Sequence, residues 1–352
     1  MVTNATVSPS QWPLVSIVVV NYNGGERLAL CLESLLQATY PAPELIIVDN
    51  ASTDTSPQII RDFAATHPDL IALWSASNLG YAGAVNLALP SVRGDYVAVM
   101  NMDVTVERDW LEPLIAFLGD HPEAGAVNPL ILLSDGKRVN AEGLDIHVTG
   151  LGFTRGLGRA LDSVSRSPIR TSGLSGALFV MRTDLLRRIG GLDTTGFLYH
   201  EDVNLSWLLH LMGLDLYSVR QSLVRHDYLL TMYAAKIHLL ERNRWAMLFA
   251  YLRPSSIVLL LPALLLTEIL MWGFCTLRGP SFMKAKWASY GWVYDQWHEI
   301  QGRRRMVESL RTTSDWAVLK KLRWAYAWDQ LVKVGGERGP SARNNIEGSR
   351  QG

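Results

Sequence analysis

The feature that most constrains the fold is an alternation of short apolar runs with segments of helical periodicity over the first 130 residues. The apolar runs predicted as strands are Val15–Val20, Leu45–Val48, Ile71–Trp74, Tyr96–Met100 and Ala124–Asn128. The segments predicted as helices between them are Arg27–Gln37, Ser56–Ala65, Ala82–Leu89 and Asp109–Leu118. Continuous apolar strands joined by helices through short links are typical of a mainly parallel sheet with helices on both faces. We therefore predict the α/β fold class.

The pattern after residue 130 is less regular. Residues 134–172 are rich in Gly, Ser and Arg, and we expect a long loop or an excursion over the site. Regular elements then return, and the predicted ones are a strand at Ala177–Met181, helices at Asp184–Ile189 and Val203–Met212, and a strand at Leu214–Val219. From Tyr228 onward the periodicity predicts long amphipathic helices.

The formal net charge of zero conceals two unlike parts. Residues 1–230 hold 15 basic and 24 acidic side chains, whereas residues 231–352 hold 18 basic and 9 acidic ones. Eight of the 12 Trp also lie in the second part. A basic, Trp-rich composition favours contact with anionic membrane lipid, and the neutral total argues against a nucleic-acid partner. We expect a helical membrane-associated region at 231–334.

One apolar run inside that region, 257–277, is long enough to cross a bilayer. Pro262 and Glu268 interrupt it, and basic residues flank it on both sides, so the distribution of positive charge gives no orientation for a single pass. A span, a re-entrant hairpin and an in-plane helix pair remain open, as does a pair of buried core helices.

The two cysteines, Cys31 and Cys275, are too few for a disulfide framework and show no zinc-ligand spacing. Residues 1–13 are polar, without a basic segment followed by an apolar one, so we predict a flexible N-terminus and no secretory signal. The acidic part should therefore lie in the cytoplasm. The Gly- and Arg-rich tail at 335–352 is predicted to be disordered.

Polar residues follow several of the predicted strands. In parallel sheets ligands bind beyond the carboxyl ends of the strands. Asp49 and Asp103 stand at such ends, and a carboxylate beside a phosphate-bearing ligand suits a hard divalent cation. Asn101 could add an amide oxygen, and His226 could bind the same cation through a neutral ring nitrogen. Taken singly, each of these residues is as well explained by a turn or a structural hydrogen bond.

Two adjacent carboxylates, Glu201 and Asp202, begin a predicted helix, where the helix dipole stabilises negative charge. One of them could simply cap the helix. The functional alternative is a general base that takes a proton from an attacking hydroxyl, with a pKa raised by burial or by the second carboxylate.

Together these segments resemble glycosyltransferase family 2, with the GT-A fold, over roughly Leu14 to Trp245. The stretches that carry the resemblance are 15–23, 46–54, 78–86, 100–104, 175–182, 190–193 and 197–202. The subgroup most like this chain includes rhamnosyltransferases of cell-surface polysaccharide assembly. The resemblance implies a GT-A catalytic domain at 14–230 and an inverting, metal-dependent transfer from a nucleotide-diphospho-sugar.

The resemblance also implies roles for individual residues. Tyr22, Asn23 and Asp49 would bind the donor nucleobase side, and Asn78, Asn86 and Asn101 would lie near the ribose, diphosphate or sugar. Asp103 and His226 would hold Mg²⁺ or Mn²⁺. Asp202, next to Glu201, would be the catalytic base.

Three departures from the family pattern bear on these roles. A third acid often follows the Glu-Asp pair, where this chain has Val203-Asn204, which leaves Asp202 as the better base candidate. Asn101 stands where many relatives have Asp. Residues 241–245 resemble the Gln-x-x-Arg-Trp motif of processive synthases with Glu for Gln, but one apolar run favours transfer of a single sugar.

The expected donor is deoxythymidine-diphosphate-rhamnose or a uridine-diphosphate sugar, and the expected acceptor is a glycan or a polyprenyl-linked glycan at the cytoplasmic face of the cell membrane. The oligomeric state is left open. A non-catalytic nucleotide-sugar-binding or scaffold module of the same fold is the alternative. A dinucleotide-dependent oxidoreductase is disfavoured, because Asn-Tyr-Asn-Gly-Gly follows the first strand in place of Gly-x-Gly-x-x-Gly.

Overall fold

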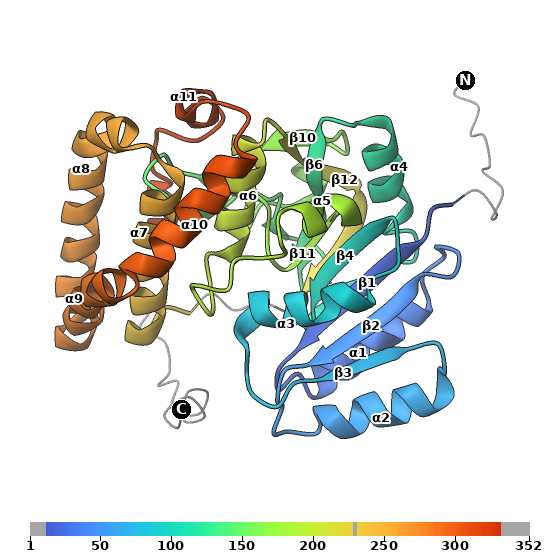
Figure 1. Cartoon of the computed structure of the whole chain (residues 1–352). Coiled ribbons are helices and arrows are strands. Elements are labelled where there is room, and N and C mark those ends of the chain that lie inside the picture. The colour runs from blue at the N-terminus through green and yellow to red at the C-terminus, as the bar shows by residue number, and fades with distance from the viewer. Residues whose placement is uncertain (1–11, 228–230, 332–352) are drawn as a thin grey trace.

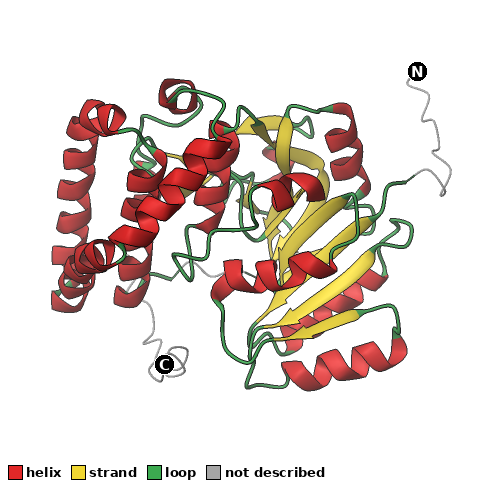
Figure 2. Cartoon of the chain, in the orientation of Figure 1, coloured by secondary structure: helices red, strands yellow, loops and turns green. Residues whose placement is uncertain are grey.

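The structure is a computed structural model that describes residues 12–227 and 231–331. The predictions of a flexible stretch at 1–13 and of a disordered tail at 335–352 fall almost wholly outside the described residues. Within them, the chain forms a large sheet on one side of the molecule and a group of long helices on the other (Figures 1 and 2).

The first half of the sheet is parallel, as predicted. Its neighbouring strands are β3 (Ile71–Trp74), β2 (Glu44–Asp49), β1 (Val15–Asn21) and β4 (Tyr96–Asn101). Every residue of β1 is buried, because the sheet is covered on both faces. The helices beside these strands are α1 (Glu26–Leu36), α2 (Ser56–Thr66) and α3 (Gly80–Ala88), the last followed by the 3₁₀ turn η2 (Leu89–Ser91). Alternate β1 residues reach two different cores: Val18 and Val20 pack with α3, whereas Ile17 and Val19 pack with α1 and α2.

The second half of the sheet is mixed, which refines the prediction of a mainly parallel sheet. β11 (Leu178–Arg182) runs antiparallel between β4 and β6 (Ala124–Leu133), and β12 (Asp215–His226) pairs parallel with β6. The edge pairings are antiparallel and involve β10 (Ile169–Thr171), β5 (Val104–Val106) and β7 (Val139–Ala141). The helices of this half are α4 (Glu112–Asp120), α5 (Thr183–Arg188) and α6 (Glu201–Leu211).

The segment 134–172 is more ordered than the predicted loop. It contains β7, the pair β8 (Leu144–Ile146) and β9 (Gly152–Thr154), the 3₁₀ turn η3 (Leu161–Ser163) and β10. Residues 139–150 are almost entirely buried. The Gly and Arg residues that suggested a loop serve tight turns and ion pairs instead, such as that of Arg159 with the buried Glu142, which Arg220 of β12 also contacts.

The C-terminal part consists of α7 (Ala234–Tyr251), α8 (Pro254–Arg278), α9 (Pro280–Asp295), α10 (Trp297–Leu310) and α11 (Asp315–Leu319). α9 and α10 pack against α7, and α8 packs on α9 at the edge of the molecule opposite β3 (Figure 1). One buried apolar cluster includes sheet residues such as Val18 together with Leu248 and Val307, so α7 and α10 share a core with the sheet. Among the described helices, α8 is the one long and apolar enough to cross a membrane.

Candidate active site

The loops after β1 and β2 form one polar edge of the sheet. Asp49 ends β2 and is 4% exposed; its carboxylate accepts hydrogen bonds from Asn21 Nδ2 at 2.8 Å and from Ser52 N at 3.1 Å. Asn23 adopts a positive φ of 52°, and its Oδ1 accepts from Thr53 N at 2.8 Å. Tyr22 lies between these two ties at the end of β1 and is half-buried. The two loops are therefore fixed against each other where a ligand would meet the sheet.

The predicted asparagines at the start of α3 have different surroundings. Asn78 Oδ1 accepts from Asn50 Nδ2 at 3.0 Å and from Gly80 N at 2.9 Å, so this side chain shapes the turn beside the edge. Asn86 lies farther along α3, where its amide exchanges two 2.8 Å hydrogen bonds with the backbone of Leu192. Both ends of the Asn86 amide are therefore engaged in joining α3 to the loop after α5, which argues against the predicted direct contact with the donor.

Asp103 and His226 come together although 123 positions separate them in the sequence. β5 pairs antiparallel with β12 so that His226 opposes Val104, and Asp227 N donates to Asp103 O at 3.0 Å. His226 Nε2 lies 3.3 Å from Asp103 Oδ1. Asn101 ends β4 two residues before Asp103, and its backbone N–H donates to Ala177 O at 3.0 Å.

The other ring nitrogen of His226 lies 3.1 Å from Asn140 Oδ1 on β7. An amide oxygen only accepts, so the ring proton belongs on Nδ1. With the proton on Nδ1, the Nε2 atom that faces the Asp103 carboxylate would be free to bind a cation shared with it. Asn140 falls in the segment predicted as a loop, and sequence reasoning did not identify it.

The carboxylates Glu201 and Asp202 occupy the first turn of α6. Asp202 Oδ2 accepts from Gly176 N at 3.1 Å, and its Oδ1 accepts from Val203 N at 2.8 Å. Tyr81 on α3 donates to Gly176 O at 2.8 Å, which ties the Asp202 contact to the parallel half of the sheet. Among the described residues no Lys or Arg side chain forms an ion pair with either carboxylate.

Burial therefore controls the protonation of this pair. Burial raises the pKa of Asp202 above its ordinary value, although His200 and backbone N–H groups oppose the rise. Burial, and secondarily the neighbouring Asp202 carboxylate, raise the pKa of Glu201 to about 8. With a pKa of about 8, Glu201 is mainly protonated at neutral pH. Asp202 accepts hydrogen bonds from two backbone N–H groups, which are partners that favour an ionised carboxylate.

The loop before α6 is held in a strained conformation. Phe197, Tyr199 and His200 all have positive φ angles, of 64°, 66° and 72°, which non-glycine residues rarely adopt. Asn243 on α7 stabilises this loop. Its Nδ2 lies within 3.2 Å of three carbonyl oxygens, those of Gly196, Leu198 and Tyr199. Strained backbone residues cluster at functional sites, and here they immediately precede the Glu201–Asp202 pair.

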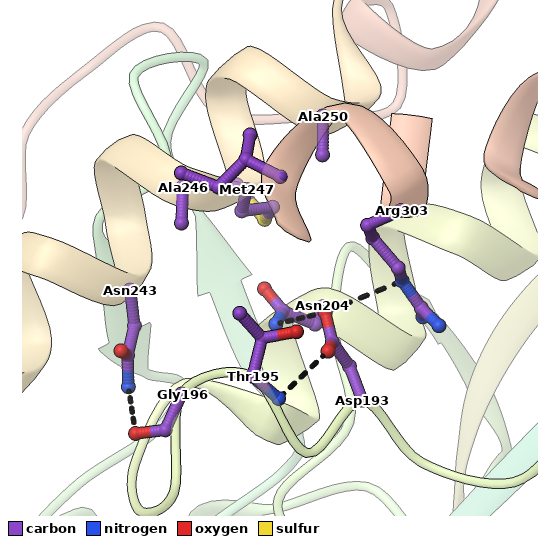
Figure 3. Close-up of a pocket in the computed structure, with 10 residues that line it drawn as sticks. Asp193, Thr195, Gly196, Asn204, Asn243, Ala246, Met247, Ala250 and Arg303 are labelled. Atoms are coloured by element: carbon purple, nitrogen blue, oxygen red, sulfur yellow. Dashed lines mark hydrogen bonds and ion pairs between the residues drawn. The ribbon is translucent and has the colours of Figure 1, made fainter. Parts of the chain in front are cut away.

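Asp193 connects the same loop to α6 and α10. Its carboxylate accepts from Thr195 N at 3.0 Å and from Asn204 Nδ2 at 3.4 Å, and it lies 3.2 Å from Arg303 Nε (Figure 3). The cavity among these residues has a volume of about 10 Å³, enough for about one water molecule. The cavity is thus a small packing gap between helices and has no room for a sugar.

A larger pocket of about 250 Å³ opens beside Asp103. Its lining brings together two arginines, two aspartates and three other residues: Arg27, Leu30, Asp103, Thr105, Ser134, Arg225 and Asp227. Within the described ranges no three His, Cys, Asp or Glu side chains gather in a metal-binding group. A divalent cation at Asp103 and His226 would therefore take its remaining ligands from substrate or water.

Residues 16–190, about half of the chain, match the family model of glycosyl transferase family 2. The chain belongs to this family. Among curated relatives, the N-acetylglucosaminyl-diphospho-decaprenol L-rhamnosyltransferase of Mycobacterium tuberculosis is 29% identical over 216 residues, which cover 54% of this chain and 69% of that protein. The glycosyltransferase GlyG of Streptococcus pneumoniae is 34% identical over 101 residues, 29% of this chain, and the match spans only 34% of GlyG's own length.

Solved structures of other glycosyltransferases confirm the GT-A fold of this family 2 domain. GalNAc-T7, solved with UDP, GalNAc and Mn²⁺, superposes with a TM-score of 0.58 at 17% identity, covering 70% of this chain and 49% of that one. The mannosyltransferase PcManGT of Pyrobaculum calidifontis, solved with GDP-Man and Mn²⁺, gives 0.52 at 20% identity, covering 86% and 88%.

In this family 2 domain the fold brings most of the predicted polar residues to one edge of the sheet. Asp49, Asn101 and Asp103 end or follow parallel strands, and His226 joins them through the antiparallel pairing of β12. Asn86 is the exception.

Proposed function

We propose that this chain transfers one sugar from a nucleotide-diphospho-sugar to an acceptor hydroxyl, with inversion at the anomeric carbon. The observation that carries the proposal is the setting of Asp202. Its carboxylate is held by Gly176 N, receives no ion pair from a described Lys or Arg, and has a pKa raised by burial. These are the properties of a general base that works near neutral pH.

The pair of Asp103 and His226 is proposed to hold a divalent cation, Mg²⁺ or Mn²⁺. The residues fit such an ion: Asp103 Oδ1 is buried and accepts no hydrogen bond from a described residue, and Asn140 sets the ring so that Nε2 faces it. A bound cation would offset the charge that develops on the leaving diphosphate. Two side-chain ligands leave positions for diphosphate oxygens and water.

The chain's own residues are assigned the proton transfer and the contacts to the donor. Asp202 accepts the proton of the acceptor hydroxyl as its oxygen attacks the sugar, and the nucleoside diphosphate departs from the opposite face. Glu201 stays protonated and does not compete as a base. Tyr22 and Asp49 would contact the nucleobase, and Asn78 and Asn101 would border the ribose or diphosphate. Asn86 is reassigned to positioning α3.

The finer identity of the substrates rests on relatives. The mycobacterial relative is named as an L-rhamnosyltransferase acting on a decaprenol-linked N-acetylglucosamine, and PcManGT was solved with GDP-Man and Mn²⁺. We accordingly propose a role in cell-surface glycan synthesis, with deoxythymidine-diphosphate-rhamnose as the first donor to test and a polyprenyl-linked glycan as acceptor. The catalytic domain at 14–230 would work at the cytoplasmic face, with 231–334 against the membrane.

A donor screen tests this proposal. The full chain is incubated with Mn²⁺ and individual nucleotide-sugars, with and without a polyprenyl-diphosphate-linked N-acetylglucosamine, and released nucleoside diphosphate is measured. The proposal is supported if nucleoside diphosphate is released only with acceptor present, and if Asp103→Ala weakens both this release and its dependence on the metal ion. Donor binding by calorimetry without release from any donor would contradict it in favour of a non-catalytic binding module.

A further inference from the structure

The outer face of α8 is an uninterrupted apolar surface. Glu268 and Arg278 are the only charged residues in this 25-residue helix. Six large side chains are between 46% and 70% exposed on one side of it: Val258, Leu259, Leu261, Leu265, Leu266 and Ile269. Their positions fall within about half of the helix circumference at 3.6 residues per turn. Exposed apolar side chains gathered in this way mark a contact surface.

The opposite face of α8 is bound to the protein. Leu260, Leu264, Met271 and Cys275 are buried there at spacings of four, seven and four residues. Thr267 lies on the same face, 3.0 Å from Thr149 Oγ1 and 2.8 Å from the hydroxyl of Tyr326.

The single acidic side chain of α8 also points inward. Glu268 lies 2.5 Å from an Arg244 nitrogen on α7 and 2.8 Å from Lys286 Nζ on α9. Arg244 and Lys286 also pair with the buried Glu241, so two acids balance two bases inside the helix group. The charge that interrupted the apolar run in the sequence is therefore absent from the outer face.

Exposed aromatic side chains border this face on two sides. On α9, Trp287 is 71% exposed and its ring centroid lies 6.4 Å from that of Trp272 on α8. On the other side, Tyr326 lies against α8 and the neighbouring Trp324 and Trp328 are about half exposed. Trp side chains beside an apolar surface are typical of the boundary between lipid headgroups and acyl chains.

Basic side chains accompany these aromatics. Lys284 is exposed one turn before Trp287 on α9, Arg323 is exposed beside Trp324, and Lys320 lies 5.6 Å from the ring of Trp316. Exposed acids in the same regions, Asp295 and Asp329, are fewer. The border of the apolar face thus complements an anionic surface.

We propose that α8 lies in the plane of an anionic lipid bilayer, with its outer face in the boundary between headgroups and acyl chains, and does not cross it. Crossing would draw the ionic pairs of Glu268 and the polar helix α9, with Lys284 and Asp295, into hydrocarbon, which is costly. Lying in the plane satisfies both faces of α8 at once.

The benefit of placing α8 in the bilayer plane rests on the proposed function, because it would bring the active site to a lipid-linked acceptor. Thr149 contacts α8, and the next carbonyl, Gly150 O, accepts from His200 Nε2 at 2.9 Å immediately before Glu201. A bilayer under α8 would therefore hold the catalytic loop close to the headgroups, within reach of a lipid-linked acceptor.

Co-sedimentation of the full chain with vesicles tests the surface. Vesicles of phosphatidylcholine with phosphatidylglycerol should bind the chain, and pure phosphatidylcholine vesicles should bind it more weakly. Leu265→Glu and Ile269→Glu should each weaken partitioning about tenfold. The matched control is Leu36→Glu, since Leu36 on α1 is 51% exposed against 55% for Leu265, and it should change nothing.

Charge reversal separates the anionic component. Lys284→Glu should weaken binding to the anionic vesicles by about fivefold or more, whereas Arg188→Glu, exposed on α5, should not. No vesicle binding by the wild type, or a concentration-dependent dimer that Leu265→Glu dissolves, would overturn the proposal in favour of a second copy as the occupant.

Labelling distinguishes lying from spanning. Ser255→Cys and Ser281→Cys place thiols at exposed positions at the two ends of α8, and the native Cys31 and Cys275 are buried. With protein added to preformed vesicles, an impermeant maleimide should label both positions. Protection of one end only would show a span and overturn the in-plane arrangement.

Vesicle binding needs neither donor nor turnover, so the two proposals fail separately. Asp202→Asn should bind vesicles like the wild type. Transfer to a water-soluble acceptor without vesicle binding would contradict only the proposed membrane surface. Vesicle binding without transfer would contradict only the proposed function.

Discussion

Two glutamates of this chain have pKa values shifted in opposite directions. Glu201 begins α6 in the proposed active site, and burial raises its pKa to about 8. Glu241 lies in the C-terminal helices, where burial also raises the pKa, yet the cations of Arg244 and Lys286 outweigh it and lower the value to about 2. A glutamate side chain thus favours its protonated form in one region and its ionised form in the other.

The difference follows the partners: Glu241 is the more deeply buried of the two, yet it is the one whose pKa is lowered. Glu241 accepts two hydrogen bonds from Arg244, at 3.0 and 2.8 Å, and pairs with Lys286. Glu201 and Asp202 meet backbone N–H groups and a histidine whose pKa burial lowers, His200. Paired acids hold helices together, whereas acids left without a cation remain available for chemistry.

The largest expected effect comes from the proposed base, Asp202. Asp202→Asn should lower turnover by about a thousandfold, because an amide cannot accept the acceptor's proton. Donor affinity should stay nearly unchanged in calorimetry. The control Asp69→Asn, an exposed acid far along the sheet, should retain full turnover. Turnover of Asp202→Asn within tenfold of the wild type would show that Asp202 is not the general base.

The paired glutamate should matter for stability instead. Glu241→Gln leaves Arg244 and Lys286 with one acid between them, so the free energy of unfolding should fall by about 3 kcal/mol. Chemical denaturation of the variant measures this. An unchanged midpoint would show that the buried cluster does not hold α7, α8 and α9 together.

A smaller effect should follow from the residue that orients His226. Asn140→Ala should raise the Mn²⁺ concentration needed for half-maximal activity by about tenfold or more, because the ring loses the partner that fixes its tautomer. Saturating Mn²⁺ should restore most of the turnover number. A fall in turnover that Mn²⁺ does not restore would assign Asn140 a purely structural part.

The smallest effect on activity is expected for Glu201→Gln, because the amide resembles the protonated acid. Turnover near neutral pH should stay within about threefold of the wild type. Its folded-state pKa lies above the unfolded value, so the wild type holds this proton more tightly when folded and loses stability as pH rises from about 4.5 toward about 8.

Thermal unfolding at several pH values checks this linkage. The melting temperature of Glu201→Gln should rise relative to that of the wild type between about pH 5 and about pH 9. A difference that does not change with pH would mean that Glu201 is already ionised in the folded protein.

The sequence was a good guide wherever burial follows local pattern. The apolar runs located β1, β2 and β4, because strands covered on both faces contain little else, and they also located the partly exposed edge strand β3. It failed where burial depends on distant partners. β12 continues beyond the predicted Val219 to His226, because Arg220 pairs with the buried Glu142 and Ser222 donates to Trp110 O.

The candidate site shows the same limit. Asp49 and Asp103 could be found from their places after strands, and Glu201 and Asp202 from their place before a helix. Asn140 and Asn243 could not, because the pairing of β7 with β6 and the packing of α7 on the strained loop decide their contacts. The tie between Asn86 and Leu192 likewise depends on two segments separated by 106 positions.

Carboxyl-resolved NMR titration of isotopically labelled protein tests the central claim most directly, namely that Glu201 lacks a cationic side-chain partner among the described residues whereas Glu241 pairs with Arg244 and Lys286. The account predicts a Glu resonance that titrates near pH 8 and disappears in Glu201→Gln, and a Glu241 resonance that stays ionised down to about pH 3. Titration of both glutamates near the ordinary value of 4.5 would contradict it.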